Sequence, residues 1–196
     1  MSEDNGESRL SSNSEGIPPE QPVWLRQMPR EALDALLMKL IHQVVLLHGM
    51  TRNELVQLLG AMQKDVHEAG EFVFREGDHP GHTLHILISG AVEVRRRALG
   101  GNADLLVASL KPGETFGEMA LVDHKERSAS VLAIEPSVTL KISAADLNRF
   151  PDIAAKLYFN IARMLTQRLR NANDLLLKHQ REVSRLLAEL NAKAYQ

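Results

Sequence analysis

The spacing of apolar residues changes along the chain and divides it into four segments. Residues 1–22 are rich in Ser, Glu, Asn, Gly and Pro and cannot bury enough apolar surface to offset ordering, so we expect a disordered tail. Apolar side chains recur every three or four positions over residues 23–49, which predicts an amphipathic helix. Short β-like runs dominate residues 50–150, and helical spacing returns over residues 151–196.

The predicted N-terminal helix, from Trp24 to His48, has one apolar stripe. Its members are Leu33, Leu36, Leu37, Leu40, Ile41, Val44 and Val45. We expect this stripe to pack against the flank of the following domain, and a helix that docks an effector is the alternative. After it, Thr51 and Glu54 have the spacing of a capping box, which predicts a second helix that ends near Gly60 or shortly beyond.

The segment after this second helix predicts strands. Six short β-like runs are separated by glycine and proline turns. The runs are Glu71–Arg75, Thr83–Ser89, Ala91–Arg97, Leu105–Leu110, Val131–Ile134 and Val138–Ile142. Regular short strands with such turns are typical of a jelly-roll-like β-barrel, so the predicted fold class is α+β, a barrel with flanking helices.

The last segment predicts a long helix that starts at Ser143 or Phe150 and ends near Ala192. Its apolar positions alternate three and four apart: Ala162, Leu165, Leu169, Ala172, Leu176, His179, Val183, Leu186 and Leu190. This heptad seam, polar only at His179, is typical of a coiled coil. A helix of about 60 Å, at about 1.5 Å per residue, is longer than one small domain. We therefore expect a parallel homodimer, with folding back onto segment 23–49 as the alternative.

Composition narrows the classes of function. The 196 residues include no cysteine, which excludes disulfides and thiolate metal sites. The formal net charge of −2 at pH 7 argues against the basic face of a dedicated nucleic-acid binder, so we expect no direct nucleic-acid binding. Neither a signal peptide nor a membrane-spanning run is visible, and we expect a cytoplasmic protein without membrane contact.

One stretch has the chemistry of an anion site. It reads Phe-Gly-Glu-Met-Ala-Leu from Phe116 and, after a short turn, Arg-Ser-Ala-Ser-Val from Arg127. The start of a helix offers unpaired backbone N–H groups to an anion, and an arginine adds charge-assisted bonds to phosphate oxygens. Glu118 can accept from a sugar hydroxyl. These groups suit a cyclic phosphate on a ribose.

This stretch resembles the phosphate-binding cassette of the cyclic-nucleotide-binding domain family, and every fixed position of the family's pattern is filled. The resemblance covers about Met50 to Phe150, and the helix after it is similar to the dimer helix of catabolite-activator-type regulators, without their DNA-binding domain. It implies that Glu118 holds the ribose 2′-hydroxyl and that Arg127 holds the cyclic phosphate. The ligand-binding residues it implies are Phe116, Gly117, Glu118, Met119, Ala120, Arg127, Ser128 and Ala129, of which Gly117, Ala120 and Ser128 contribute backbone or hydroxyl donors.

The resemblance also bears on the base. Arg168 and Leu169 stand where the family's long helix has a Thr-Ser pair that reads adenine. We expect Arg168 to be a further ligand contact, whose guanidinium stacks on either purine or donates to guanine; a surface charge without ligand contact is the alternative. The expected ligand is cAMP, with cGMP as the alternative, and with weak discrimination between the two.

Three histidines, His79, His82 and His85, raise the question of a metal site. On a strand, residues 82 and 85 have opposite parity and point to opposite faces. We therefore expect no metal, and solvated turn histidines instead. The family more commonly has an aspartate at position 82 and an aromatic at position 85, and we interpret both differences as surface or turn changes.

Together these features predict a sensor module that is not an enzyme, since no nucleophile–base pair or carboxylate dyad is readable. A cyclic nucleotide would shift a two-state arrangement of barrel and dimer helix, and an unknown downstream protein would read the change. One alternative is a transcription regulator without a helix-turn-helix. It would contact DNA through Arg163, Arg168, Arg170, Lys178, Arg181 and Arg185. The other alternative is a scaffold that no longer binds a ligand.

Overall fold

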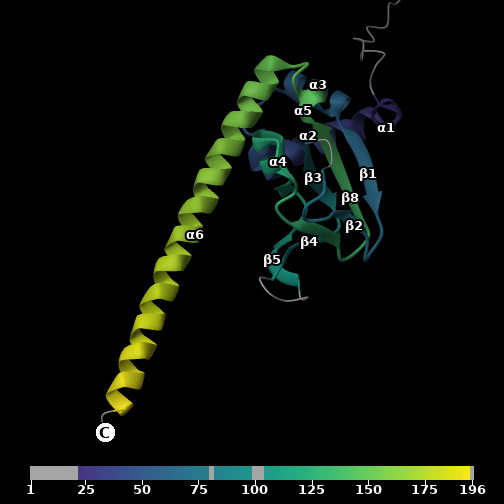
Figure 1. The fold of residues 1–196 in the computed structure, drawn as a ribbon. Coiled ribbons are helices and arrows are strands. Elements are labelled where there is room, and N and C mark those ends of the chain that lie inside the picture. The colour runs from purple at the N-terminus through teal and green to yellow at the C-terminus, as the bar shows by residue number, and fades with distance from the viewer. Residues whose placement is uncertain (1–21, 80–81, 99–103, 195–196) are drawn as a thin grey trace, which may run out of the picture.

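The structure is a computed structural model that describes residues 22–79, 82–98 and 104–194, so nearly all of the expected N-terminal tail lies outside the described residues. Within these ranges, eight strands form two antiparallel sheets (Figure 1). One sheet has the order β1-β8-β3-β6 and the other the order β2-β7-β4-β5. The jelly-roll-like α+β class is confirmed, as two packed sheets in place of a closed barrel.

All six predicted runs form strands, and two further strands were not predicted. The strands are β1 Gln63–His67, β2 Phe72–Phe74, β3 Thr83–Ser89, β4 Val92–Arg97, β5 Asp104–Leu110, β6 Thr115–Phe116, β7 Ser130–Ala133 and β8 Ser137–Ser143. β1 escaped prediction because it is mostly polar and pairs only with β8, at the edge of its sheet. β6 is two residues long, too short to produce a period.

The prediction of a single helix from Trp24 to His48 is wrong. The chain forms α1 Val23–Arg26, α2 Arg30–Gln43 and the 3-10 turn η1 Val45–Leu47. Pro29, with a ψ of 145°, separates α1 from α2, and Val44 ends α2 in an extended conformation. This break turns Leu46 and Leu47 into the core, where each is 1% exposed. Tertiary burial therefore overrides a periodicity that continues through the break.

Two hydrophobic cores hold the domain together. The larger one joins the helices to the sheet β1-β8-β3-β6, and it buries Leu37 and Leu40 of α2. The expected stripe thus packs on the flank of its own domain. The smaller core lies between the two sheets and contains Phe74, Leu87, Val92, Leu110, Phe116, Val131 and Ala133.

Two local signals read from the sequence are present. The capping box forms, with Thr51 N donating to Glu54 Oε2 at 2.7 Å and Glu54 N donating to Thr51 Oγ1 at 3.3 Å. It opens α3, Arg52–Ala61. Gly90 connects β3 to β4 at a φ of +87°, and a Cβ there would lie 2.2 Å from Ser137 Oγ, so a larger residue cannot fit without moving β8.

The predicted C-terminal helix is confirmed as α6, Pro151–Ala194, which follows β8 and the short helix α5, Ala144–Leu147. Its first turns pack on the domain through Ile153, Leu157 and Ile161. Asn160 donates to the carbonyl oxygens of Leu46 and His48 at 2.9 Å each. Farther along, α6 runs away from the domain (Figure 1).

The distal part of the predicted seam is exposed. Leu169, Leu176 and Leu190 are 62%, 66% and 64% exposed, and no described residue of the chain covers them. The first turns of α6 contact the end of segment 23–49, at Leu46 and His48. The seam from Leu169 onward does not fold back onto this segment, and α2 packs its own stripe into the domain core. None of the described helices is both long and apolar enough to span a membrane.

Candidate functional site

A pocket of about 530 Å³ brings together all nine predicted ligand-binding residues. Eight of them belong to the segment from β6 through α4, Glu118–Asp123, to the loop before β7, and Arg168 reaches the pocket from α6. Other parts of the lining come from residues that the sequence did not single out. They are Phe74 of β2, Val94 and Arg96 of β4, and Val107, Ala108, Ser109 and Leu110 of β5. Several of these are apolar, which suits a ligand with a flat organic part.

Gly117 makes the turn from β6 into α4. Its φ is +80°, and a Cβ at this position would lie 2.7 Å from both Arg127 Nη1 and the Thr83 carbonyl oxygen. Glycine is therefore required both for the left-handed conformation and for the close approach of the guanidinium. Because α4 begins directly afterwards at Glu118, the residues of its first turn, whose N–H groups have no partner within the helix, line the pocket.

Arg127 is the buried cation of the site, at 3% exposure. Its Nη1 donates to the Thr83 carbonyl oxygen at 2.9 Å and to the Gly117 carbonyl oxygen at 3.1 Å, and its Nη2 donates to Thr83 Oγ1 at 2.6 Å. The guanidinium lies 4.0 Å from the centre of the Phe74 ring. These contacts hold the side chain in one orientation against the floor of the pocket.

The charge of Arg127 is only partly compensated. Burial lowers the pKa of Arg127 to about 10, and the carboxylates of Asp78 and Glu118 act in the opposite direction. Nε is buried without a hydrogen-bond partner among the described atoms. A buried cation whose hydrogen-bond acceptors are neutral is costly, and an anion in the pocket would relieve that cost.

Glu118 is the buried carboxylate of the site, at 3% exposure. Its Oε1 forms an ion pair with Nη1 of Arg168, whose side chain is 48% exposed. Arg168 Nη2 also donates to the Thr115 carbonyl oxygen at 3.4 Å. The guanidinium from α6 thus lies against the carboxylate of the cassette, and the expected contact of Arg168 with a ligand stays a prediction.

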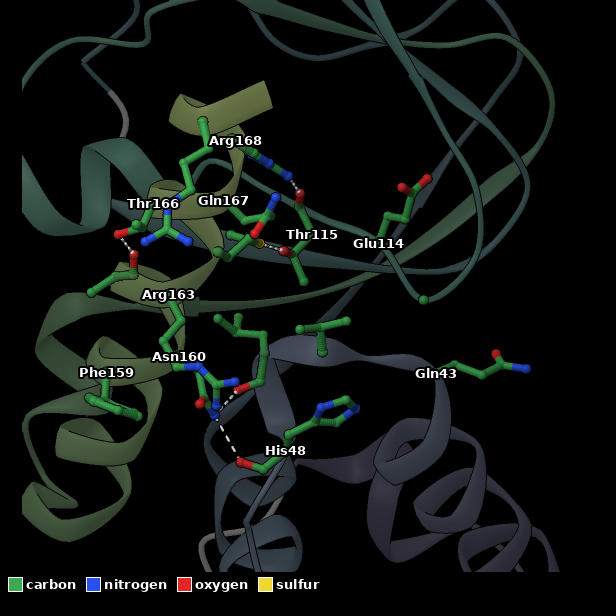
Figure 2. Close-up of a pocket in the computed structure, with 16 residues that line it drawn as sticks. Gln43, His48, Glu114, Thr115, Phe159, Asn160, Arg163, Thr166, Gln167 and Arg168 are labelled. Carbon is green, nitrogen blue, oxygen red and sulfur yellow. Dashed lines mark hydrogen bonds between the residues drawn. The ribbon is translucent and has the colours of Figure 1, made fainter. Parts of the chain in front are cut away.

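A second hollow, of about 790 Å³, lies where α6 leaves the domain. Figure 2 shows Arg168 reaching from α6 toward Thr115, and Asn160 bonded to the His48 carbonyl. This hollow shares Glu114, Thr115 and Arg168 with the smaller pocket. Its other arginines, Arg163 and Arg170, are exposed. Although larger, it therefore lacks the buried charges of the cassette pocket, and Arg168 stands between the two.

The structure corrects the interpretation of the histidines. His79 is exposed and lies 3.1 Å from a Glu126 oxygen, and His82 packs edge-on against His124. His85, in contrast, is 4% exposed and stacks on Phe116, so describing it as a solvated turn residue is wrong. Over the described ranges, no three metal-ligating side chains cluster closely enough to hold a metal ion.

Comparison with known families identifies the module. Residues 64–152 match the sequence model of the cyclic nucleotide-binding domain. The chain contains a cyclic nucleotide-binding domain. The match begins in β1 and ends in the first turn of α6, so this domain comprises both sheets and all of the pocket except Arg168.

Relatives of this cyclic nucleotide-binding domain occur in proteins of different kinds. The chain is 38% identical over 138 residues to the cyclic AMP receptor protein of Thermus thermophilus, which covers 67% of this chain and 61% of that protein. The crystal structure of the catabolite activator protein from Thermus thermophilus matches with a TM-score of 0.62 at 36% identity, over 67% of this chain and 61% of that one. Human cGMP-dependent protein kinase 2 is 31% identical over 108 residues, 55% of this chain and 14% of the kinase. The chain thus spans about three fifths of the bacterial relative and a small part of the kinase.

Proposed function

We propose that this chain is a cyclic-nucleotide sensor in which Arg127 holds the cyclic phosphate. The observation that carries this proposal is the buried guanidinium, 3% exposed, that faces the pocket with neutral acceptors and an unpartnered Nε. A phosphate oxygen would supply both the missing negative charge and the missing acceptor.

The neighbouring residues support a ribose cyclic phosphate in particular. Glu118 directly follows Gly117, and its carboxylate can accept the ribose 2′-hydroxyl while it remains paired with Arg168. Gly117, Ala120 and Ser128 would supply backbone or hydroxyl donors to the phosphate. Phe116, Met119 and Ala129 complete the lining.

We propose cAMP as the ligand, with weak discrimination against cGMP. The named relatives support both nucleotides, because one is a cyclic AMP receptor and another is a cGMP-dependent kinase. Arg168 is the pocket residue supplied by α6, and its guanidinium can stack on either purine. We expect the two affinities to lie within about tenfold, or 1.4 kcal/mol.

We further propose that residues 50–150 are the ligand-binding unit and residues 151–196 a parallel dimerisation helix. The exposed seam of α6 supports this, since a partner helix would bury the leucines that the described residues leave uncovered. Ligand binding would change how Glu118 holds Arg168, and thereby the position of α6, which a downstream protein in the cytoplasm would read. The chain itself would not be a catalyst.

Isothermal titration of the purified chain with cAMP, cGMP and linear AMP tests the proposal. We expect both cyclic nucleotides to bind and linear AMP to bind much more weakly, because its phosphate is not held against the ribose. Binding of no cyclic nucleotide would leave a ligand-free scaffold as the better account. A gel shift with DNA tests the regulator alternative, and a metal analysis tests the expectation of no bound metal.

A further inference from the structure

The floor under Arg127 contains a polar pair that the cassette pattern does not include. Thr83 and His85 lie two residues apart on β3, so their side chains share one face of the strand. That face points into the core between the sheets, where His85 stacks on Phe116 at 5.0 Å and tilts against Phe74 at 5.7 Å. The imidazole thereby packs against two aromatic rings, which also contact each other with 5.9 Å between their centroids.

A continuous set of hydrogen bonds joins this pair to the guanidinium. Arg127 can only donate, so Thr83 Oγ1 accepts from Nη2 at 2.6 Å. The same oxygen lies 3.1 Å from His85 Nε2. The Thr83 carbonyl oxygen accepts from Nη1 at 2.9 Å. Two atoms of Thr83 thus determine the plane of the guanidinium, and His85 restricts the rotamer of Thr83.

The charge of His85 agrees with this arrangement. Burial, followed by the nearby charges of Arg127, Lys141 and His67, lowers the pKa of His85 to about 3. The imidazole is therefore neutral at ordinary pH and adds a hydrogen bond beside Arg127 without adding a second positive charge. A hydrocarbon ring at position 85 would keep the stacking and would leave the Thr83 hydroxyl with Arg127 as its partner.

We infer that Thr83 and His85 are positioning residues that aim Arg127 at one oxygen of a bound cyclic phosphate. This rests on the proposed binding of a cyclic nucleotide in the same pocket. A guanidinium whose two terminal nitrogens are held in place meets a tetrahedral phosphate in one geometry. Thr83 and His85 should therefore increase the preference of Arg127 for one exocyclic phosphate oxygen over the other.

The test uses Thr83→Val and His85→Phe, which remove the hydroxyl and the imidazole nitrogens while preserving shape. The fold offers a matched control: His67, also buried, bonds Thr139 Oγ1 at 3.3 Å in the same sheet and does not contact Arg127. Thr139→Val therefore removes an equivalent histidine–threonine bond. Thr83→Ser keeps the hydroxyl and should restore wild-type binding. Circular dichroism and thermal melting establish that each variant is folded.

Binding is measured by titration with cAMP and with its two phosphorothioate diastereomers, in which sulfur replaces one or the other exocyclic oxygen. We expect Thr83→Val to weaken cAMP binding about tenfold and His85→Phe about threefold. The ratio of the two diastereomer affinities should move toward one in both variants. Thr139→Val and Thr83→Ser should stay within about twofold of wild type in affinity and keep its diastereomer ratio.

The outcomes separate this inference from the function on which it rests. If wild type and Thr139→Val bind cAMP, and Thr83→Val binds equally well with an unchanged diastereomer ratio, the positioning role is overturned while the proposed function stands. If wild type binds no cyclic nucleotide, both are overturned. Should His85→Phe fail to fold, Thr83→Val alone decides, because Thr83 is only half-buried and valine has its shape.

Discussion

At the scale of single residues, the site depends on a cation that is buried before any ligand arrives. Arg127→Ala should weaken cAMP binding by roughly 30- to 3,000-fold, since removing one partner of a buried charge pair costs about 2–5 kcal/mol. Titration calorimetry measures this loss. Arg75→Ala is the matched control, because the Arg75 guanidinium also covers an aromatic ring, at 3.7 Å from Phe72, yet does not line the pocket. Binding by Arg127→Ala within threefold of wild type would contradict the cassette assignment.

Arg168 allows a second prediction at this scale. Its ion pair with Glu118 orients the carboxylate that we propose for the ribose hydroxyl, which cAMP and cGMP share. Arg168→Ala should therefore lower the affinity for both nucleotides, by a similar factor. Parallel titrations with the two ligands measure it. A hundredfold preference for cAMP that persists in Arg168→Ala would show that residues of the two sheets, not Arg168, select the base.

His85 gives the domain an acid-sensitive stability. Its folded pKa of about 3 lies below the ordinary value of 6.5, so between these limits the unfolded chain binds a proton here and the folded chain does not. The stability contribution of the neutral imidazole is complete above pH 6.5 and declines as the pH falls, by up to about 1.4 kcal/mol per pH unit. Urea unfolding of wild type and His85→Phe at several pH values measures it. Equal slopes for the two proteins would contradict the prediction.

At the scale of elements, α6 has two parts with different packing. Its first turns are fixed by Asn160 and by buried Ile153, Leu157 and Ile161, whereas its distal face has apolar residues that no other part of the described structure covers. Exposed apolar stripes of this length on a soluble helix indicate association with another helix. In the proposed dimer, the seam is the element by which the state of the pocket would reach the second subunit.

A chain that ends at Leu165 should be monomeric, or a much weaker dimer, because it lacks seven of the nine seam positions. Truncation also removes Arg168, so Leu176→Glu with Val183→Glu is the better-matched test, since it leaves the pocket intact. Both variants should lose dimerisation in light scattering, and the double variant should still bind nucleotide. A stable dimer in either case would move the interface away from α6.

At the scale of the whole molecule, ligand binding and stability are linked. A ligand that binds only the folded domain, at about one hundred times its dissociation constant, adds about 2.7 kcal/mol to the free energy of unfolding. The midpoint of thermal unfolding should then rise by about 5–10 °C with cAMP. Scanning calorimetry measures the shift, and Arg127→Ala at the same cAMP concentration should show almost none. An equal shift in Arg127→Ala would indicate binding elsewhere on the molecule.

Much of this architecture follows from local sequence. The capping box at Thr51, the glycine turns, the six predicted strands and the heptad spacing of α6 each depend on residues close in the chain, where turn chemistry and periodicity act directly. The candidate site could be predicted for the same reason: eight of its nine residues lie in one short stretch, whose glycine, carboxylate and arginine have recognisable chemistry.

What the sequence alone did not determine depends on contacts between distant residues. The break of the N-terminal helix at Val44 follows from the burial of Leu46 and Leu47, and the interior position of His85 from the packing of two sheets. Thr83 lies 44 residues before Arg127, from whose guanidinium it accepts hydrogen bonds, and Arg168 lies 50 residues after Glu118. Periodicity carries no information about such pairs. The sequence therefore determined which groups are available to an anion, and only the tertiary structure decided what holds them in place.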